Sequence, residues 1–266
     1  MLCELADAWG HKRTIRLRPL VGRDEALVFA HARSSASLVT DLLAQVAVAP
    51  DATLSARERM AALTLGERDV LLARLRQENF GDQVESTATC PECRGRLDMH
   101  FSLEALLAHH RPRSTRSITC QEGGWLRLTN DRITFRLPTG ADLEATEQQV
   151  GLTTEEQRQW LIAQCVHPTP AQARLVPRIE RAMWRLSPQL SQELEARCAM
   201  CGTTFTATFD VETFVLREIR LAARTVYRDV HLLARWYHWR EEEILALPRQ
   251  RRMQYVAELR SDLRGG

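Results

Sequence analysis

Four of the seven cysteines form two Cys-x-x-Cys pairs, which are the residues best suited to chemistry in this chain. Cys90 and Cys93 bracket a Pro-Glu dipeptide, and Cys198 and Cys201 bracket an Ala-Met dipeptide far downstream. A tight Cys-x-x-Cys turn directs two thiolates toward one ion, and two such turns complete a tetrahedral zinc site. Because protein would fill all four positions, none is left for water or substrate. The pattern therefore predicts one structural zinc ion held by four thiolates.

The sequence around the two pairs repeats beyond the cysteines themselves. Three residues follow each pair at the same offsets, namely Leu97, Phe101 and Ser102 after the first and Phe205, Phe209 and Asp210 after the second. Each pair is therefore predicted to lead into an alternating strand and then a helix capped by Ser102 or Asp210. The two halves would form a split zinc-ribbon-like β module, with the intervening helices as an insertion.

Three other interpretations of the pairs stay open. The cysteines could be reduced, metal-free thiols left from an ancestral site. A redox pair needs a Cys-x-x-Cys at a helix N-terminus after a βαβ pattern, whereas each pair here leads into a strand. Two separate zinc ions would each need histidines; His100 lies near the first pair, but no histidine matches it near the second. Cys3, Cys120 and Cys165 lack partners at ligand spacing and are expected to be buried structural cysteines.

The segments that must position these pairs are predominantly helical with small β elements, so the predicted fold class is α+β. Capping boxes at Ser55, Thr64 and Thr153 start three helices, and Gly81 ends the second. Periodicity predicts further helices over residues 21–48 with a break at 34–37, 103–110, 139–150, 153–166, 176–186, from Ser187 onward, 211–237, 241–247 and 249–263. Alternation predicts β structure within residues 1–20 and a hairpin within 118–138 that turns at Thr-Asn-Asp, while HPTPAQ is a break.

The chain divides into four predicted regions. Residues 1–85 are a mainly helical N-terminal region, and 86–110 hold the first zinc knuckle with its strand and helix. Residues 111–196 are an inserted hairpin and helical region, and 197–266 hold the second knuckle and the C-terminal helices.

Composition excludes several classes of function. The chain has 266 residues, 44% of them hydrophobic and 26% charged, and a formal charge of +2, which gives no strong attraction to nucleic acid or anionic membranes. No apolar run is long enough to span a bilayer, so no membrane partner is expected. The odd cysteine count favours a reducing cytoplasm. A glycine-rich phosphate loop, a HExxH motif and a nucleophile elbow are all absent, so we expect neither an enzyme nor a small-molecule substrate.

Two basic segments support an alternative function, a zinc-ribbon nucleic-acid-binding regulator. RPRSTR (residues 111–116) follows the His109–His110 pair, which is expected to be a solvated helix end, and RQRR covers residues 249–252. Next to three glutamates, RQRR is expected to be a solvated face. The near-neutral charge counts against this alternative.

The C-terminal segment is rich in apolar residues at helical spacing. A helix-in-groove docking surface for a partner protein is one interpretation, and a self-contained helical hairpin is the other. The residues expected to bind the partner are Trp236, Tyr237, Trp239, Ile244, Leu247 and Tyr255.

Taken in order along the chain, several segments resemble the T-even-type phage baseplate hub assembly chaperones of contractile tails and related injection machines. The resemblance lies in LTLGERDVLLARLRQENFGD, TCPEC with its following strand, FRLPTGADL, FDVETFVLREI and YHWREEEILALPRQRRMQYVAEL. It extends from about Leu17 to Leu259, although the second knuckle is CAMC and the segment from Arg111 to Arg127 is longer than expected. The resemblance implies a non-enzymatic assembly factor or structural component of the baseplate hub or wedge. Its partners would be hub or wedge proteins, in the cytoplasm or in a phage-like particle.

Overall fold

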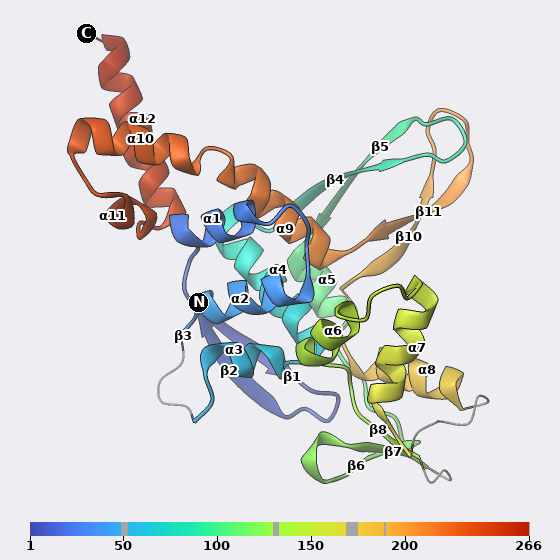
Figure 1. Ribbon diagram of the computed structural model, residues 1–266. Coiled ribbons are helices and arrows are strands. Elements are labelled where there is room, and N and C mark those ends of the chain that lie inside the picture. The colour runs from blue at the N-terminus through green and yellow to red at the C-terminus, as the bar shows by residue number, and fades with distance from the viewer. Residues whose placement is uncertain (49–52, 130–132, 169–174, 189, 266) are drawn as a thin grey trace.

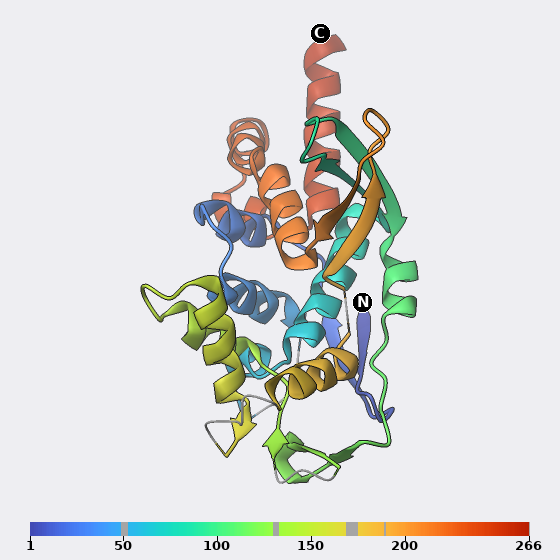
Figure 2. The same ribbon diagram turned by 90° about the vertical axis from the view of Figure 1, so that its right-hand side faces the viewer.

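A computed structural model describes residues 1–48, 53–129, 133–168, 175–188 and 190–265. A helical body carries three extensions: a pair of long hairpins, a small sheet and the C-terminal helices (Figures 1 and 2). The predicted mixture of helices with small sheets is confirmed. The described residues contain no helix that is both long and apolar enough to cross a membrane.

The helices account for most of the regular structure. In chain order they are α1 (Gly22–Ala30), α2 (Ala36–Val46), α3 (Ala56–Ala61), α4 (Leu65–Phe80), α5 (Leu103–His109), α6 (Gly140–Glu147), α7 (Thr154–Gln164), α8 (Val176–Leu186), α9 (Val211–Ala223), α10 (Val226–Tyr237), α11 (Glu241–Leu245) and α12 (Arg249–Gly265).

The strands form four antiparallel sheets among the described residues. The first sheet is β1 (Leu2–Ala6), β2 (Lys12–Leu17) and β3 (Ala47–Val48), and two separate hairpins are β4 (Gln83–Thr89) with β5 (Arg96–Ser102) and β10 (Gln192–Arg197) with β11 (Thr204–Phe209). The fourth sheet is β6 (Ile118–Cys120), β7 (Leu126–Leu128), β8 (Thr134–Phe135) and β9 (Val166–His167).

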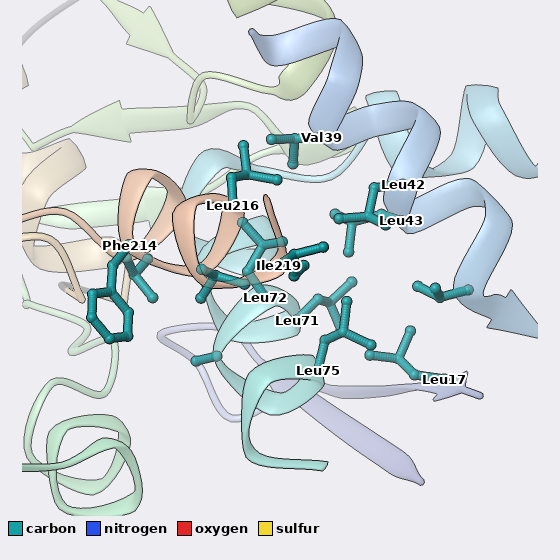
Figure 3. Close-up of a cluster of buried hydrophobic side chains, with 14 of the residues drawn as sticks. Leu17, Val39, Leu42, Leu43, Leu71, Leu72, Leu75, Phe214, Leu216 and Ile219 are labelled. Atoms are coloured by element: carbon teal, nitrogen blue, oxygen red, sulfur yellow. The ribbon is translucent and has the colours of Figure 1, made fainter. Parts of the chain in front are cut away.

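The main core lies between α2, α4 and α9, with the first sheet against it (Figure 3). Leu42 and Leu43 of α2 face Leu71 and Leu72 of α4, and Ile219 of α9 lies between them. These side chains are fully buried, which is where hydrophobic stabilisation is strongest. Because α4 precedes the first hairpin and α9 follows the second, this core fixes the bases of both hairpins.

Local signals confirm several predicted helix ends. The capping boxes at Ser55, Thr64 and Thr153 form, each with a glutamate three residues later. Gly81 ends α4 with a φ of 89°, a backbone conformation that residues other than glycine rarely adopt. The break between α1 and α2 covers residues 31–35, so it includes Ser34 and Ser35, whereas Ser37 lies within α2. The Thr-Asn-Asp turn and the HPTPAQ break fall largely outside the described residues.

Two predicted helices are wrong in detail. Ser187 ends α8 instead of starting a helix, and the chain then forms β10, because Gln192–Arg197 pairs with β11. The expected helix over 211–237 is divided into α9 and α10 at residues 224 and 225. Strands β4 and β10, which precede the cysteine pairs, were not expected from the sequence.

Two expectations about burial are also wrong. Cys3 and Cys165 are buried as expected, but Cys120 is exposed on the edge strand β6. RQRR is a solvated face only in part, because Gln250 and Arg251 are exposed but Arg252 is fully buried. It pairs with the buried carboxylate of Glu25 in α1 and lies 3.3 Å from that of Asp229 in α10, so the charge is compensated. Arg249 also bonds Glu25, at 3.0 Å, and together these pairs attach α12 to the body.

A second buried arginine joins three elements of the body. Arg68 of α4 is 1% exposed and donates to the carbonyl oxygen of Ala36 at 2.7 Å. Burial lowers the pKa of Arg68, and the nearby Glu212 acts in the opposite direction. Gly140, the first residue of α6, packs directly on the guanidinium, where an added Cβ would collide with Nη1.

We therefore expect Gly140→Ala to destabilise the protein by about 2 kcal/mol, as overpacking of a filled site does. Urea unfolding would measure this loss. The cost should shrink in an Arg68→Met background, because truncation removes the atom that collides. Ala141→Val, at an exposed position in the same helix, is the control and should change stability little. Equal stability of Gly140→Ala and the wild type would contradict this packing.

Candidate metal centre

The two cysteine pairs lie in the turns of two hairpins that extend from the body on the same side (Figure 1). Cys90 and Cys93 join β4 to β5, which are paired from Gln83 opposite Ser102 to Thr89 opposite Arg96. Cys198 and Cys201 join β10 to β11. A strand therefore runs into each pair as well as out of it, which holds each turn rigidly at a hairpin tip.

The two turns have the same backbone geometry. The amide of Cys90 donates to the carbonyl of Gly95, and the amide of Cys198 donates to that of Thr203, both at 2.9 Å. The residue after each second cysteine has a positive φ, 60° at Arg94 and 76° at Gly202. The helix caps match as well, since Ser102 accepts from Ala105 and Asp210 from Thr213. The internal repeat inferred from the sequence is thus a repeat of structure.

The two repeats face each other so that cysteines at different positions of the motif become neighbours. The first cysteine of each pair lies beside the second cysteine of the other: the Sγ atoms are 3.7 Å apart for Cys90 and Cys201 and 3.5 Å for Cys93 and Cys198. Phe101 and Phe209, which hold the same position in the two repeats, meet edge to face at 4.8 Å between centroids. Such exchange is what an approximate twofold axis between two similar units produces.

The four sulfur atoms have the spacing of a tetrahedral site. All lie within 4.8 Å of one another. Zn–S bonds of about 2.3 Å in a tetrahedron would place the sulfurs about 3.8 Å apart, close to the two measured pairs. The cysteines are free, and the paired sulfurs are too far apart for a disulfide bond of about 2.05 Å. The first cysteine of each pair is buried and the second exposed.

The thiols influence one another's ionisation. The side chain and then the backbone of Thr203 lower the pKa of Cys201 to about 6, and backbone N–H groups of Cys201 and Met200 lower that of Cys198. The Gly95 amide lowers the pKa of Cys93, but hydrogen bonds with the three neighbouring cysteines raise it to about 12 overall. The site favours some thiolates yet resists a full set of four negative charges. A divalent cation would relieve that conflict.

The arrangement can hold one metal ion between the two pairs. Among the described residues, these four cysteines form the cluster with metal-ligand geometry, and His100 is not part of it. The shared grouping fits one ion better than two ions completed by histidines. A tetrahedral set of four thiolates suits zinc or iron, and it leaves no position for substrate.

The six residues expected to bind a partner have different environments. Ile244 is fully buried against Leu233 and Val256. Tyr237, Trp239 and Tyr255 pack on one another with centroids 5.0 to 6.0 Å apart, which holds the end of α10 to α12. Leu247 is half-buried.

Trp236 is 48% exposed, and Tyr237 presents a partly exposed edge. The C-terminal segment therefore packs as a helical hairpin with its own small core, and it carries aromatic side chains on its outer surface.

Comparison with known proteins gives one match. A family model described as T4 bacteriophage base plate protein matches residues 4–169, more than half of the chain. No curated protein and no solved structure matches the chain. The matched segment includes Cys90 and Cys93, whereas Cys198, Cys201 and the C-terminal helices lie beyond it.

The two turns differ in the residue that holds the positive φ, which is Arg94 in the first and Gly202 in the second. Because a left-handed conformation costs a non-glycine residue about 1 kcal/mol or more, Arg94→Gly should stabilise the protein by up to about 1 kcal/mol. Arg96→Gly, within β5, is the matched control and should destabilise it by a similar amount. Denaturant midpoints would measure both. A less stable Arg94→Gly variant would refute the proposed equivalence of the two turns.

Proposed function

Since the chain belongs to the family of T4 bacteriophage base plate proteins, we propose that it is a non-enzymatic assembly factor or structural component of a contractile, phage-like baseplate. It acts in the hub or wedge, in the manner of the hub assembly chaperones, either in the cytoplasm during assembly or within the particle. One zinc ion, held by Cys90, Cys93, Cys198 and Cys201, stabilises it. The family match carries the baseplate role, and the convergence of these four thiols carries the proposed zinc site.

The family and the site both favour a structural role over an enzymatic one. Baseplate proteins build an assembly, and four protein thiolates leave zinc no open coordination position. The ion instead joins two distant parts of the chain. The first pair belongs to the segment that matches the family, and the second pair lies outside it. A zinc ion here would tie the C-terminal part to the family segment.

Partner docking is assigned to the outer surface of the C-terminal helices. Arg252, Val256 and Leu259 face inward along α12, and Leu263 continues their stripe. Leu263 is 48% exposed, because α12 extends past the elements that cover its first turns (Figures 1 and 2). The apolar part of this stripe, from Val256 to Leu263, extends beyond the helices of this chain that pack on α12. Such a stripe suits a helix-in-groove contact with a hub or wedge protein. Trp236 and Tyr237 add aromatic surface, which is common in binding hot spots.

The proposed zinc site predicts a specific response to chelation. A strong chelator should lower the melting temperature of the wild-type protein by about 10 °C, comparable to the loss of a stabilising cross-link. Cys93→Ser should melt near the chelated value and respond no further, because its site is already incomplete. Differential scanning fluorimetry would measure these shifts.

Cys120→Ser is the matched control, because Cys120 is exposed and lies outside the cluster. It should behave as the wild type in both conditions. A wild-type melting temperature that chelation leaves unchanged would argue against a structural metal.

The docking assignment predicts separate effects on binding and stability. Trp236→Ala with Leu263→Ala should weaken co-purification with hub or wedge proteins of the same phage-like system at least tenfold, without lowering the melting temperature. Ile244→Ala should lower stability by about 2 kcal/mol or more, because Ile244 is buried. Undiminished co-purification of the double variant, or no baseplate partner for the wild type, would refute the assignment.

A further inference from the structure

An apolar groove runs between the two hairpins on the face shown in Figure 2, where β10 (orange) lies beside α5 (green). Its volume is about 670 Å³. The apolar residues that line it are Leu97, Met99, Phe101, Leu106, Leu194 and Phe209. Leu97, Met99 and Phe101 alternate along β5 and are half-buried. The described residues therefore cover these three side chains of β5 only in part.

The strands beside the groove offer backbone groups as well as side chains. Both hairpins are two-stranded sheets among the described residues, so β5 pairs with β4 alone and β10 with β11 alone. Consecutive residues of both strands line the groove, Met99 to Phe101 and Leu194 to Ala196, as the edge of a strand does. An unpaired strand edge beside apolar side chains is suited to binding an extended peptide.

A strongly basic pocket continues from one end of this groove. His109 and His110 line both spaces, and the side chain of Gln192 in β10 lies 2.9 Å from Nδ1 of His110. The pocket has a volume of about 470 Å³, and Arg111, Arg113 and Arg185 line it too. The amide of Arg113 donates to the carbonyl of Arg185, which fixes this loop against the end of α8.

The described residues do not neutralise the charges of the pocket. Arg111, Arg113 and Arg185 are exposed, and none of them has a carboxylate of a described residue within ion-pair distance. Of the residues lining the pocket and the groove, Glu195 is the one carboxylate. Burial and the neighbouring His109 and Arg113 lower the pKa of His110, as expected where positive charges gather.

We propose that the groove and the pocket together bind an extended segment of a partner protein, with apolar side chains between the hairpins and acidic side chains against Arg111, Arg113 and Arg185. Charge complementarity selects an acidic partner, and guanidinium groups bind carboxylates through paired hydrogen bonds. The apolar groove favours a peptide over nucleic acid, whose backbone would leave those side chains uncovered. This surface is separate from the C-terminal helices.

The inference rests on the proposed function only in taking a baseplate protein as the source of the segment. The experiment therefore uses two sets of fluorescent peptides with the full-length, metal-loaded chain. One set tiles the baseplate proteins of the same phage-like system in 15-residue windows, and the other consists of generic peptides that alternate leucine and glutamate. Fluorescence anisotropy at about 0.15 M salt, near physiological ionic strength, would measure affinity.

We expect tight-binding peptides to combine apolar and acidic residues, and their affinity to fall at least tenfold in Arg111→Glu/Arg113→Glu. Met99→Ala should weaken binding threefold or more without loss of thermal stability. The control Arg16→Glu/Arg127→Glu changes net charge equally at exposed strand positions remote from the groove and should change affinity less than twofold.

Binding of the generic peptides alone, with the same sensitivity to the variants, would support the groove and count against the baseplate partner. Three results would overturn the inference. The first is no binding in either set, and the second is equal binding by the charge-reversed variant. The third is a preference for single-stranded DNA over every peptide, lost in the same variant, which would identify a nucleic-acid site.

Discussion

The meeting of four thiols from two separate hairpins is the constraint on which the arrangement of this molecule depends. Each hairpin is a two-stranded sheet, which is at most marginally stable by itself in water. The bases of the hairpins are fixed because α4 and α9 pack in one core, and Phe101 packs against Phe209, which belongs to that core. At the tips, hydrogen-bonded turns bring the sulfurs together. A metal ion would join the two hairpins at their tips, which lie outside the core.

Much of this site could be predicted from the sequence because its determinants are local. The offsets of the cysteines, of Phe101 and Phe209 and of the two helix caps are visible as a repeat. The exchanged pairing of Cys90 with Cys201 required the structure, since it depends on how the hairpins face each other. Strands β4 and β10 were missed because their sequences, QVESTAT and QELEAR, consist mostly of polar residues and alanine and carry a weak strand signal.

Long-range ion pairs explain why the burial of Arg252 was not predicted. Arg252 is buried because Glu25 and Asp229 meet it, and Glu25 lies 227 residues away in the sequence. No local pattern reports such a partner, so RQRR resembled an ordinary exposed basic segment. The division between α9 and α10 contains no proline or glycine, so the sequence pattern gives no signal that the helix is interrupted there. The burial of Arg252 also leaves less positive charge on this segment for a nucleic-acid-binding function.

The surfaces proposed for partner binding lie on different parts of the molecule. The aromatic outer face of the C-terminal helices belongs to other elements than the apolar groove between the hairpins and the basic pocket that continues from it. The thiol cluster lies at the hairpin tips, and the groove runs between the same two hairpins. A metal ion that fixed the tips would therefore also fix the shape of the groove, and it would link the proposed metal site to the proposed peptide binding.

Native mass spectrometry of the full-length protein, purified without added metal, tests this account most directly. The account predicts one zinc ion per chain, present in the wild type and lost completely when either pair is disrupted by Cys93→Ser or Cys201→Ser. Retention of an ion by one pair after loss of the other would contradict a shared site. So would two ions per chain, or a chain that carries none in its folded state.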